Sequence, residues 1–134
     1  MPKVIIAGSR SIEDYNLMSR IWHEYMKKHG LTVGRLTIIS GGANGADKLA
    51  EQMAKRYGIR CEVMPADWQT HGRSAGHIRN AEMAKAAGAD GRLLAFWDGQ
   101  SPGTTGMIKQ ARSVGLHVEI VRTTEAETEQ LTLL

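Results

Sequence analysis

Short apolar runs recur along the chain and are separated by longer amphipathic stretches. The first two runs, Val4 to Ala7 and Leu36 to Ile39, end at glycine-containing turns and are typical of strands buried on both faces. Three later runs predict further strands at Arg60 to Met64, Leu93 to Trp97 and His117 to Val121. The pattern therefore predicts five short strands.

Four helices are predicted between these strands, and each has recognisable ends. The first begins at a capping box formed by Ser11 and Asp14 and stops at Gly30. The other three run from Ala46 to Tyr57, from Ala75 to Ala87 and from Thr104 to Val114. Each of these three is followed by a glycine suited to a C-terminal cap.

Strands that alternate with helices favour right-handed crossovers and a parallel sheet covered on both faces. We therefore predict an α/β fold, a Rossmann-like three-layer α/β/α domain with a five-stranded parallel sheet, over residues 1–122. Residues 123–134 are interpreted as an acidic C-terminal tail, which is a frayed helix, a disordered tail or a contact with a second subunit. By analogy, a homo-oligomer is a further hypothesis.

Composition narrows the class of protein. Hydrophobic residues make up 42% and charged residues 23%, close to the averages of soluble globular proteins. No apolar run approaches the ~20 residues that cross a bilayer, and the N-terminal segment reads as a strand rather than a signal peptide. Cys61 is the single cysteine, so neither an internal disulfide nor a cysteine-rich zinc site is expected. These features predict a cytoplasmic protein with no membrane partner.

Positive charge is concentrated before the acidic tail. The chain has a formal charge of +3, but three glutamates lie in its last ten residues. The preceding residues carry all 17 Lys and Arg side chains. This balance suits an anionic ligand.

In an open parallel sheet, ligands bind beyond the carboxyl ends of the strands, where helix N-termini present free N–H groups. The loop after the first strand carries Gly8, Ser9 and Arg10. Gly8 permits a tight turn, and Ser9 with Arg10 could bind an anion. A tight turn beside a surface arginine is the alternative interpretation.

The loop after the second strand has three glycines within five residues, directly before an alanine-rich helix. Such a loop lets a phosphate or ribose approach the backbone closely, although tight packing of the helix on the sheet explains some of the glycines. It matches neither the dinucleotide fingerprint nor a Walker loop. Its candidate ligand-binding residues are Ser40, Gly41, Gly42, Ala43, Asn44, Gly45 and Asp47.

The loop after the fourth strand places a carboxylate at the strand tip, followed by a turn and a helix that opens with two threonines. This arrangement suits ribose hydroxyls and a phosphate, although Ser101 to Gly103 is also compatible with a simple β-turn. The candidates here are Asp98, Gly99, Ser101, Gly103, Thr104 and Thr105.

A fourth region supplies three more candidate ligand-binding residues. Trp68 could stack on a base, while Arg79 and Asn80 lie in the first turns of a helix and could face the same cleft. Alternatively, Trp68 packs over the edge of the core and the basic side chains are solvated. The histidines show no spacing that suggests a metal site.

Taken together, the loop motifs resemble those of a known family. The segments are Ile5 to Arg10, Ser40 to Asp47, Ala66 to Trp68, Arg79 to Met83, and Phe96 to Thr104. Their order is similar to that in the YspA or cpYpsA-related proteins of the SLOG superfamily. The resemblance implies a Rossmann-like sheet and the binding of a nucleotide or an NAD-derived signal.

Two SLOG relatives imply different activities. The Lonely Guy phosphoribohydrolases cleave the base from a nucleoside monophosphate with a Pro-Gly-Gly-x-Gly-Thr-x-x-Glu motif. The segment from Pro102 resembles a shortened version, with Met107 in place of the catalytic glutamate. DprA, which binds single-stranded DNA, has Gly-Ser-Arg and Ser-Gly-x-Ala segments similar to those at Gly8 and Ser40.

Three functional hypotheses follow. The first is a sensor or sequestering module for a nucleotide or nucleotide-derived molecule of the nucleoside-phosphate or ADP-ribose type, with no certain cofactor. The second is an N-glycosidic hydrolase or transferase, which needs a carboxylate near the anomeric carbon, with Asp98, Asp47 and Glu82 as candidates. The third is single-stranded nucleic-acid binding, which the low aromatic content of 5% does not favour.

Overall fold

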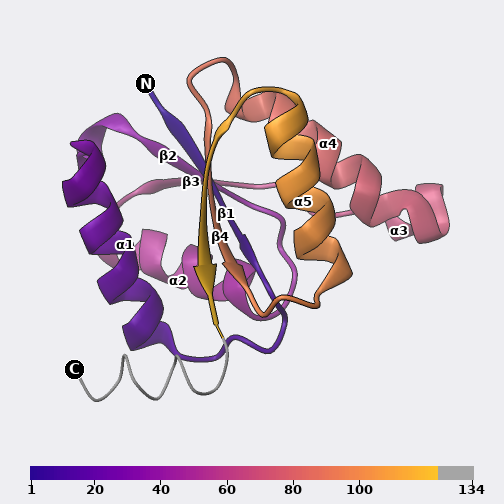
Figure 1. Ribbon diagram of the computed structural model, residues 1–134, viewed down its shortest axis with the longest axis horizontal. Coiled ribbons are helices and arrows are strands. Elements are labelled where there is room, and N and C mark those ends of the chain that lie inside the picture. The colour runs from indigo at the N-terminus through magenta and orange to yellow at the C-terminus, as the bar shows by residue number, and fades with distance from the viewer. Residues whose placement is uncertain (124–134) are drawn as a thin grey trace.

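A computed structural model describes residues 1–123 and contains one five-stranded sheet (Figure 1). Its strands are β1 (Lys3–Gly8), β2 (Thr37–Ser40), β3 (Arg60–Val63), β4 (Arg92–Trp97) and β5 (His117–Arg122). All neighbouring strands pair in parallel, in the order β3-β2-β1-β4-β5. The predicted α/β Rossmann-like fold with a five-stranded parallel sheet is confirmed.

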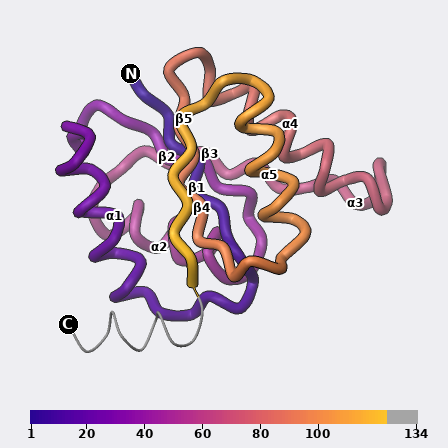
Figure 2. Tube along the Cα trace, in the orientation of Figure 1, coloured from indigo at the N-terminus to yellow at the C-terminus, as the bar shows by residue number. Residues whose placement is uncertain are grey.

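Helices cover both faces of this sheet. The long helices are α1 (Tyr15–His29), α2 (Ala46–Tyr57), α4 (Ala75–Ala87) and α5 (Pro102–Ser113). The connections also contain the short helix α3 (Trp68–His71) and two 3₁₀ turns, η1 (Val33–Arg35) and η2 (Gly72–Ser74). In the tube view, α1 lies on the side of the sheet away from α4 and α5 (Figure 2).

Alternation along the central strand explains the three layers. Val4 and Ile6 of β1 belong to a core cluster with side chains of α1 and α2, whereas Ile5 and Ala7 belong to a second cluster with α4 and α5. Because successive strand residues point to opposite faces, a continuous apolar run fills both layers.

Two predicted helix starts are wrong. The first helix begins at Tyr15, where the Asp14 carboxylate accepts a hydrogen bond from the Leu17 amide at 3.0 Å. Ser11 is not its cap, because the chain turns first and the Ile12 amide donates to the Ser9 carbonyl at 3.3 Å. The fourth helix begins two residues early, at Pro102, because proline is well tolerated at the first helical position.

The strand order reverses between β1, the central strand of the sheet, and its neighbour β4. Chain connections leave these two strands in opposite directions, so their carboxyl ends form the crevice where open α/β sheets bind ligands. The fold therefore points to the loops after Gly8 and Trp97.

The predicted acidic tail lies, apart from Thr123, outside the described residues. Among residues 1–123 no helix is long and apolar enough to cross a membrane.

Candidate functional site

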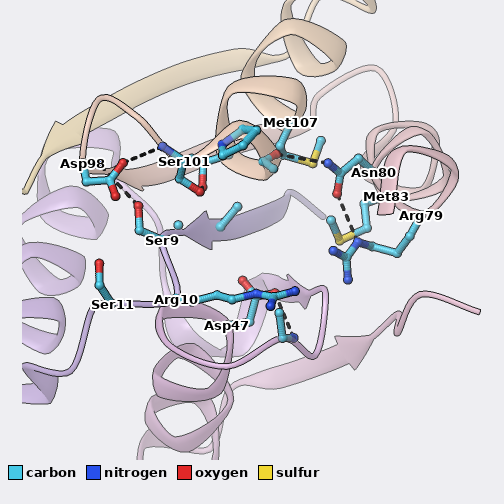
Figure 3. Close-up of a pocket in the computed structure, with 16 residues that line it drawn as sticks. Ser9, Arg10, Ser11, Asp47, Arg79, Asn80, Met83, Asp98, Ser101 and Met107 are labelled. Atoms are coloured by element: carbon cyan, nitrogen blue, oxygen red, sulfur yellow. Dashed lines mark hydrogen bonds between the residues drawn. The ribbon is translucent and has the colours of Figure 1, made fainter. Parts of the chain in front are cut away.

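A pocket of about 530 Å³ opens at the carboxyl ends of β1 and β4, at the crevice that the strand order creates. Its walls come from the loops after β1, β2 and β4 and from side chains of α2, α4 and α5 (Figure 3). Its lining consists of Ala7, Gly8, Ser9, Arg10, Ser11, Ala43, Asp47, Arg79, Asn80, Met83, Asp98, Ser101, Pro102, Gly103, Thr104 and Met107. A volume of this size lies within the range of small-molecule sites.

The loop after β1 is packed tightly against its neighbours. A Cβ atom at Gly8 would lie 2.5 Å from the Phe96 carbonyl oxygen and 2.7 Å from the Ala46 side chain, so only glycine fits. Ser9 is buried, and its hydroxyl accepts a hydrogen bond from the Asp98 amide at 3.3 Å. Arg10, by contrast, is exposed at the pocket rim. This loop therefore ties the ends of β1 and β4 together and leaves Arg10 free to meet a ligand.

The loop after β2 is held by its own polar groups. The buried Ser40 hydroxyl donates to Glu51 Oε2 at 2.7 Å and accepts from the Gly42 amide at 3.2 Å. The Ala43 amide donates to Asp47 Oδ2 at 3.1 Å. Glu51, which the sequence did not single out, thus helps to fix this loop from the second turn of α2.

Asp47 is a buried carboxylic acid in the pocket wall. Desolvation raises its pKa from 3.8 to about 6, while the hydrogen bond from the Ala43 amide and the charge of Arg79 act in the opposite direction. Burial also lowers the pKa of Arg79, and Asp47 opposes that change. Near neutral pH the wall therefore carries a carboxylate beside a guanidinium.

Arg79 and Asn80 of α4 connect two of the loops. Arg79 Nη1 donates to the Gly41 carbonyl, and its Nε donates to Asn80 Oδ1 at 3.0 Å. Asn80 Nδ2 in turn donates to the Gly103 carbonyl at 3.3 Å. The two side chains form a bridge from the loop after β2 to the first turn of α5, which sets the spacing of these two walls.

The loop after β4 is organised by Asp98. Asp98 Oδ1 accepts from the Gln100 amide at 2.8 Å and from the Ser101 amide at 2.7 Å, and these bonds lower the pKa of Asp98. Asp98 Oδ2 takes no part in these two amide bonds, and a hydrogen bond with the Ser9 side chain also lowers the pKa of Asp98. The Asp98 carboxylate thus shapes the turn and lies in the pocket wall.

Helix α5 begins in the pocket wall with unpaired backbone donors. The Thr105 amide donates to the Ser101 carbonyl at 3.0 Å, but the amides of Gly103 and Thr104 have no acceptor within the described part of the chain. Ser101 precedes the helix without forming a side-chain cap. Two free N–H groups and the positive end of the helix dipole therefore meet at the pocket.

Two buried methionines complete the wall. Met83 and Met107 line the pocket and were not predicted as ligand contacts. Each lies four residues after a predicted one, Arg79 and Gly103 respectively. Residues i and i+4 share one face of a helix, so this spacing was the signal that could have found them.

Several predicted site residues do not line the pocket. In the loop after β2, Gly45 instead packs beneath the first loop, where a Cβ atom would lie 2.5 Å from Arg10 Cα and from two carbonyl oxygens. Glu82 is exposed on another face of α4, and Trp68 is 54% exposed in α3. The residues outside the lining are Ser40, Gly41, Gly42, Asn44, Gly45, Trp68, Glu82, Gly99 and Thr105.

The pocket's donors are suited to anions rather than cations. Two arginines and free amides face it, and no group of three His, Cys, Asp or Glu side chains within residues 1–123 is arranged to hold a metal ion. The described site can therefore bind a negatively charged group through hydrogen bonds and dipoles.

The fold is Rossmann-like, and its pocket lies at the strand switch point. The model of the YspA, cpYpsA-related SLOG family (YAcAr) matches residues 2–71. The chain is also 35% identical over 123 residues to the Gene 61 protein of Mycobacterium phage D29, covering 88% of this chain and 94% of that protein. The chain belongs to the YspA, cpYpsA-related SLOG family.

Solved structures share the fold at low sequence identity. DNA processing protein A (DprA) from Streptococcus pneumoniae matches with a TM-score of 0.69 and 15% identity over 93% of this chain and 52% of that chain. The structural-genomics target TM1055 matches with a TM-score of 0.65 and 18% identity over 100% of this chain and 82% of that chain. This chain thus spans about half the length of the DprA chain.

Proposed function

We propose that the pocket binds a nucleotide or a nucleotide-derived small molecule, of the nucleoside-phosphate or ADP-ribose type, and that the protein acts as a sensor or sequestering module. The observation that carries this proposal is the pair of free amides at Gly103 and Thr104, which open α5 in the same pocket as Arg10 and Arg79. A helix N-terminus in a pocket that also holds two guanidinium groups is a favourable site for a phosphate.

The remaining lining suits the other parts of such a ligand. Asp98 lines the pocket with a carboxylate, a group that accepts hydrogen bonds from ribose hydroxyls. Met83 and Met107 offer apolar, polarisable surface to the sugar or base. The mixture of a few convergent polar groups with apolar walls is typical of small-molecule sites.

Isothermal titration calorimetry with AMP, ADP and ADP-ribose tests the proposal. We expect binding that weakens at least about tenfold in an Arg10→Ala variant, because a charge-assisted hydrogen bond contributes roughly 1.5–3 kcal/mol. Arg112→Ala is the matched control, since Arg112 is exposed in the last turn of α5 and does not line the pocket. No binding of any probe at about 1 mM to the folded protein would reject the proposal.

An N-glycosidic hydrolase is a second candidate, and the buried Asp47 favours it. Cleavage of the base passes through an oxocarbenium-like state and needs a carboxyl group near the anomeric carbon. Asp47, with its pKa of about 6, and Asp98 both line the pocket, whereas Glu82 does not. Chromatography of AMP incubated with the protein would reveal released adenine, and loss of that release in Asp47→Asn would assign the step.

Binding of single-stranded nucleic acid is a third candidate, since one structural neighbour is named as a DNA processing protein. Such binding would weaken steeply as salt is added, because phosphate contacts release counterions. Fluorescence anisotropy of a labelled oligonucleotide at two salt concentrations distinguishes it from small-molecule binding.

A further inference from the structure

The segment between β3 and α4 forms an arm beside the pocket. It comprises residues 67–74, with helix α3 and the 3₁₀ turn η2, and it projects from the body of the molecule in Figure 1. The Asp67 carboxylate accepts from the Thr70 amide at 3.1 Å, which caps α3. Gly72, with φ of 56°, makes the turn into η2. The arm thus has a defined conformation and is held at the start of α4.

Trp68 on this arm is exposed although its ring is large and apolar. It is 54% exposed, and it is the one aromatic side chain among the large exposed hydrophobic residues of the described chain. Exposed apolar area of this kind is stabilised when another flat group covers it. Trp68 is therefore a candidate contact surface outside the pocket.

The Trp68 ring lies on the same face of α4 that lines the pocket. A Cβ atom at Gly76 would lie 3.6 Å from Trp68 Cη2, so the ring sits against the first turn of α4. Gly76, Asn80 and Met83 follow one another at i, i+4 and i+7, which places them on one helix face. Asn80 and Met83 line the pocket. Along the helix axis, the Trp68 contact is about 10 Å from Met83.

The arm carries one charge of each sign, the Asp67 carboxylate at its start and the Arg73 guanidinium near its end. Arg73 is exposed in η2 and forms no ion pair within residues 1–123. Arg79, which lines the pocket, lies about one turn after Gly76 on α4. A ligand that leaves the pocket along α4 would therefore pass a guanidinium group and then reach an exposed indole.

We propose that Trp68 is an outer stacking platform for the nucleobase of a ligand whose phosphate lies at the start of α5. This inference rests on the proposed function and adds to it the direction in which the ligand extends. The base would stack on the aromatic face of Trp68. Such stacking tolerates different bases, because every base has a π-face. Recognition of the phosphate stays within the pocket.

Two probes that share a phosphate and ribose but differ in the base test the proposal. AMP carries adenine, and ribose 5-phosphate has none. We expect Trp68→Ala to weaken AMP binding about tenfold, the effect typical of one lost stacking contact, and to leave ribose 5-phosphate binding within about twofold. Trp68→Phe keeps an aromatic ring and should retain most of the AMP affinity.

Tryptophan fluorescence supplies a readout that a purely structural role would not change. The chain has three tryptophans, of which Trp22 is fully buried and Trp68 is exposed. AMP should quench the emission of the wild-type protein, ribose 5-phosphate should not, and Trp68→Phe should remove the quenching while AMP still binds. Val114→Ala is the matched control, since Val114 is 57% exposed at the opposite end of α5 from the pocket.

The outcomes separate this inference from the function on which it rests. If Arg10→Ala weakens AMP binding but Trp68→Ala does not, the stacking platform is wrong and the pocket proposal stands. Equal losses for AMP and ribose 5-phosphate in Trp68→Ala would likewise overturn the platform. If neither probe binds the wild-type protein, both proposals fail for this ligand class.

Discussion

The two glycine-rich loops of the pocket, after β2 and after β4, differ in how closely other atoms surround their glycines. In the loop after β2, a glycine is needed at position 45, where a Cβ atom would lie within 2.5 Å of the Arg10 backbone, and a Cβ atom at Gly41 would lie 2.6 Å from Arg79 Nη1. After β4, a Cβ atom at Gly103 would meet nothing within 4 Å, and its amide is unpaired in the described chain. The first loop is tightly packed, and the second leaves unpaired backbone N–H groups at the pocket.

A high density of glycines in a loop does not by itself indicate a ligand-binding loop. The loop after β2 has three glycines within five residues, yet of its seven predicted ligand contacts only Ala43 and Asp47 line the pocket. Close packing of backbone and close approach of a ligand both require glycine, so the residue type alone does not separate them. The structure separates them through the atoms that surround each glycine.

The largest expected effect is the loss of stability in Gly45→Ala. Gly45 has φ of 80°, and its new Cβ atom would clash with the Arg10 and Ser9 backbone, so we expect a loss of more than about 3 kcal/mol in the free energy of unfolding. Gly103→Ala should instead change stability by less than about 1 kcal/mol, in the stabilising direction, because alanine is favoured over glycine in a helix. Urea denaturation measures both, and equal effects would remove the distinction between the two loops.

The second effect is a pH dependence that comes from Asp47. Its pKa rises from 3.8 to about 6 on folding, so the native state binds a proton more tightly than the unfolded state. The free energy of unfolding should therefore fall as pH rises from about 4 to about 6, by up to about 3 kcal/mol, and stay lower above pH 6. Asp47→Asn removes this contribution. The free energy of unfolding of the variant, relative to that of the wild type, should therefore increase between pH 4.5 and pH 7.5.

Denaturation of both proteins at the two pH values isolates the contribution of this one carboxyl group, because the other carboxyl groups titrate in both. A stability difference between variant and wild type that stays constant with pH would contradict the account.

The third prediction tests the bridge between the two loops. Asn80 is buried and links Arg79 to the Gly103 carbonyl, so Asn80→Ala should cost about 1–2 kcal/mol of stability through lost hydrogen bonds. It should also weaken AMP binding, because the first turn of α5 is no longer held against the loop after β2. Asn16→Ala, on the exposed surface of α1, is the control. Unchanged stability and affinity in Asn80→Ala would show that the two walls are placed independently.

The smallest expected effect is that of Asp98→Asn on stability. Amide hydrogen bonds lower the pKa of Asp98, so its ionised form stabilises the fold above the ordinary pKa, and this contribution is lost as pH falls through the folded-state pKa. Because the side chain is solvated, solvent screening keeps the loss near about 0.5 kcal/mol at neutral pH. If urea denaturation shows a loss of free energy of unfolding several times larger than this, Asp98 is needed mainly to hold the fold together.

The sequence predicted the sheet, its parallel pairing and the edge at which the loops meet. Apolar runs such as Val4 to Ala7 are local, and parallel strands with helical crossovers leave little choice of where the strand ends lie. Gly8, Ser9, Arg10, Asp98 and Thr104 therefore came together as expected.

What the sequence could not supply depends on contacts between distant residues. The bond from Arg79 to the Gly41 carbonyl joins residues 38 positions apart, and the role of Gly45 depends on the Arg10 backbone lying against it. The start of α1 was misplaced because Ser11 and Asp14 both suit a helix cap, and only the turn at Ser9 decides between them. Such choices follow from tertiary packing rather than from local pattern.

The most direct test of the phosphate site is a titration of ¹⁵N-labelled protein with AMP, followed through backbone amide chemical shifts. The account predicts that the largest shifts occur at the amides of Gly103 and Thr104, with small shifts at Gly42 and Ala43, whose amides already have partners. Saturable shifts centred on the loop after β2, with Gly103 and Thr104 unmoved, would contradict it.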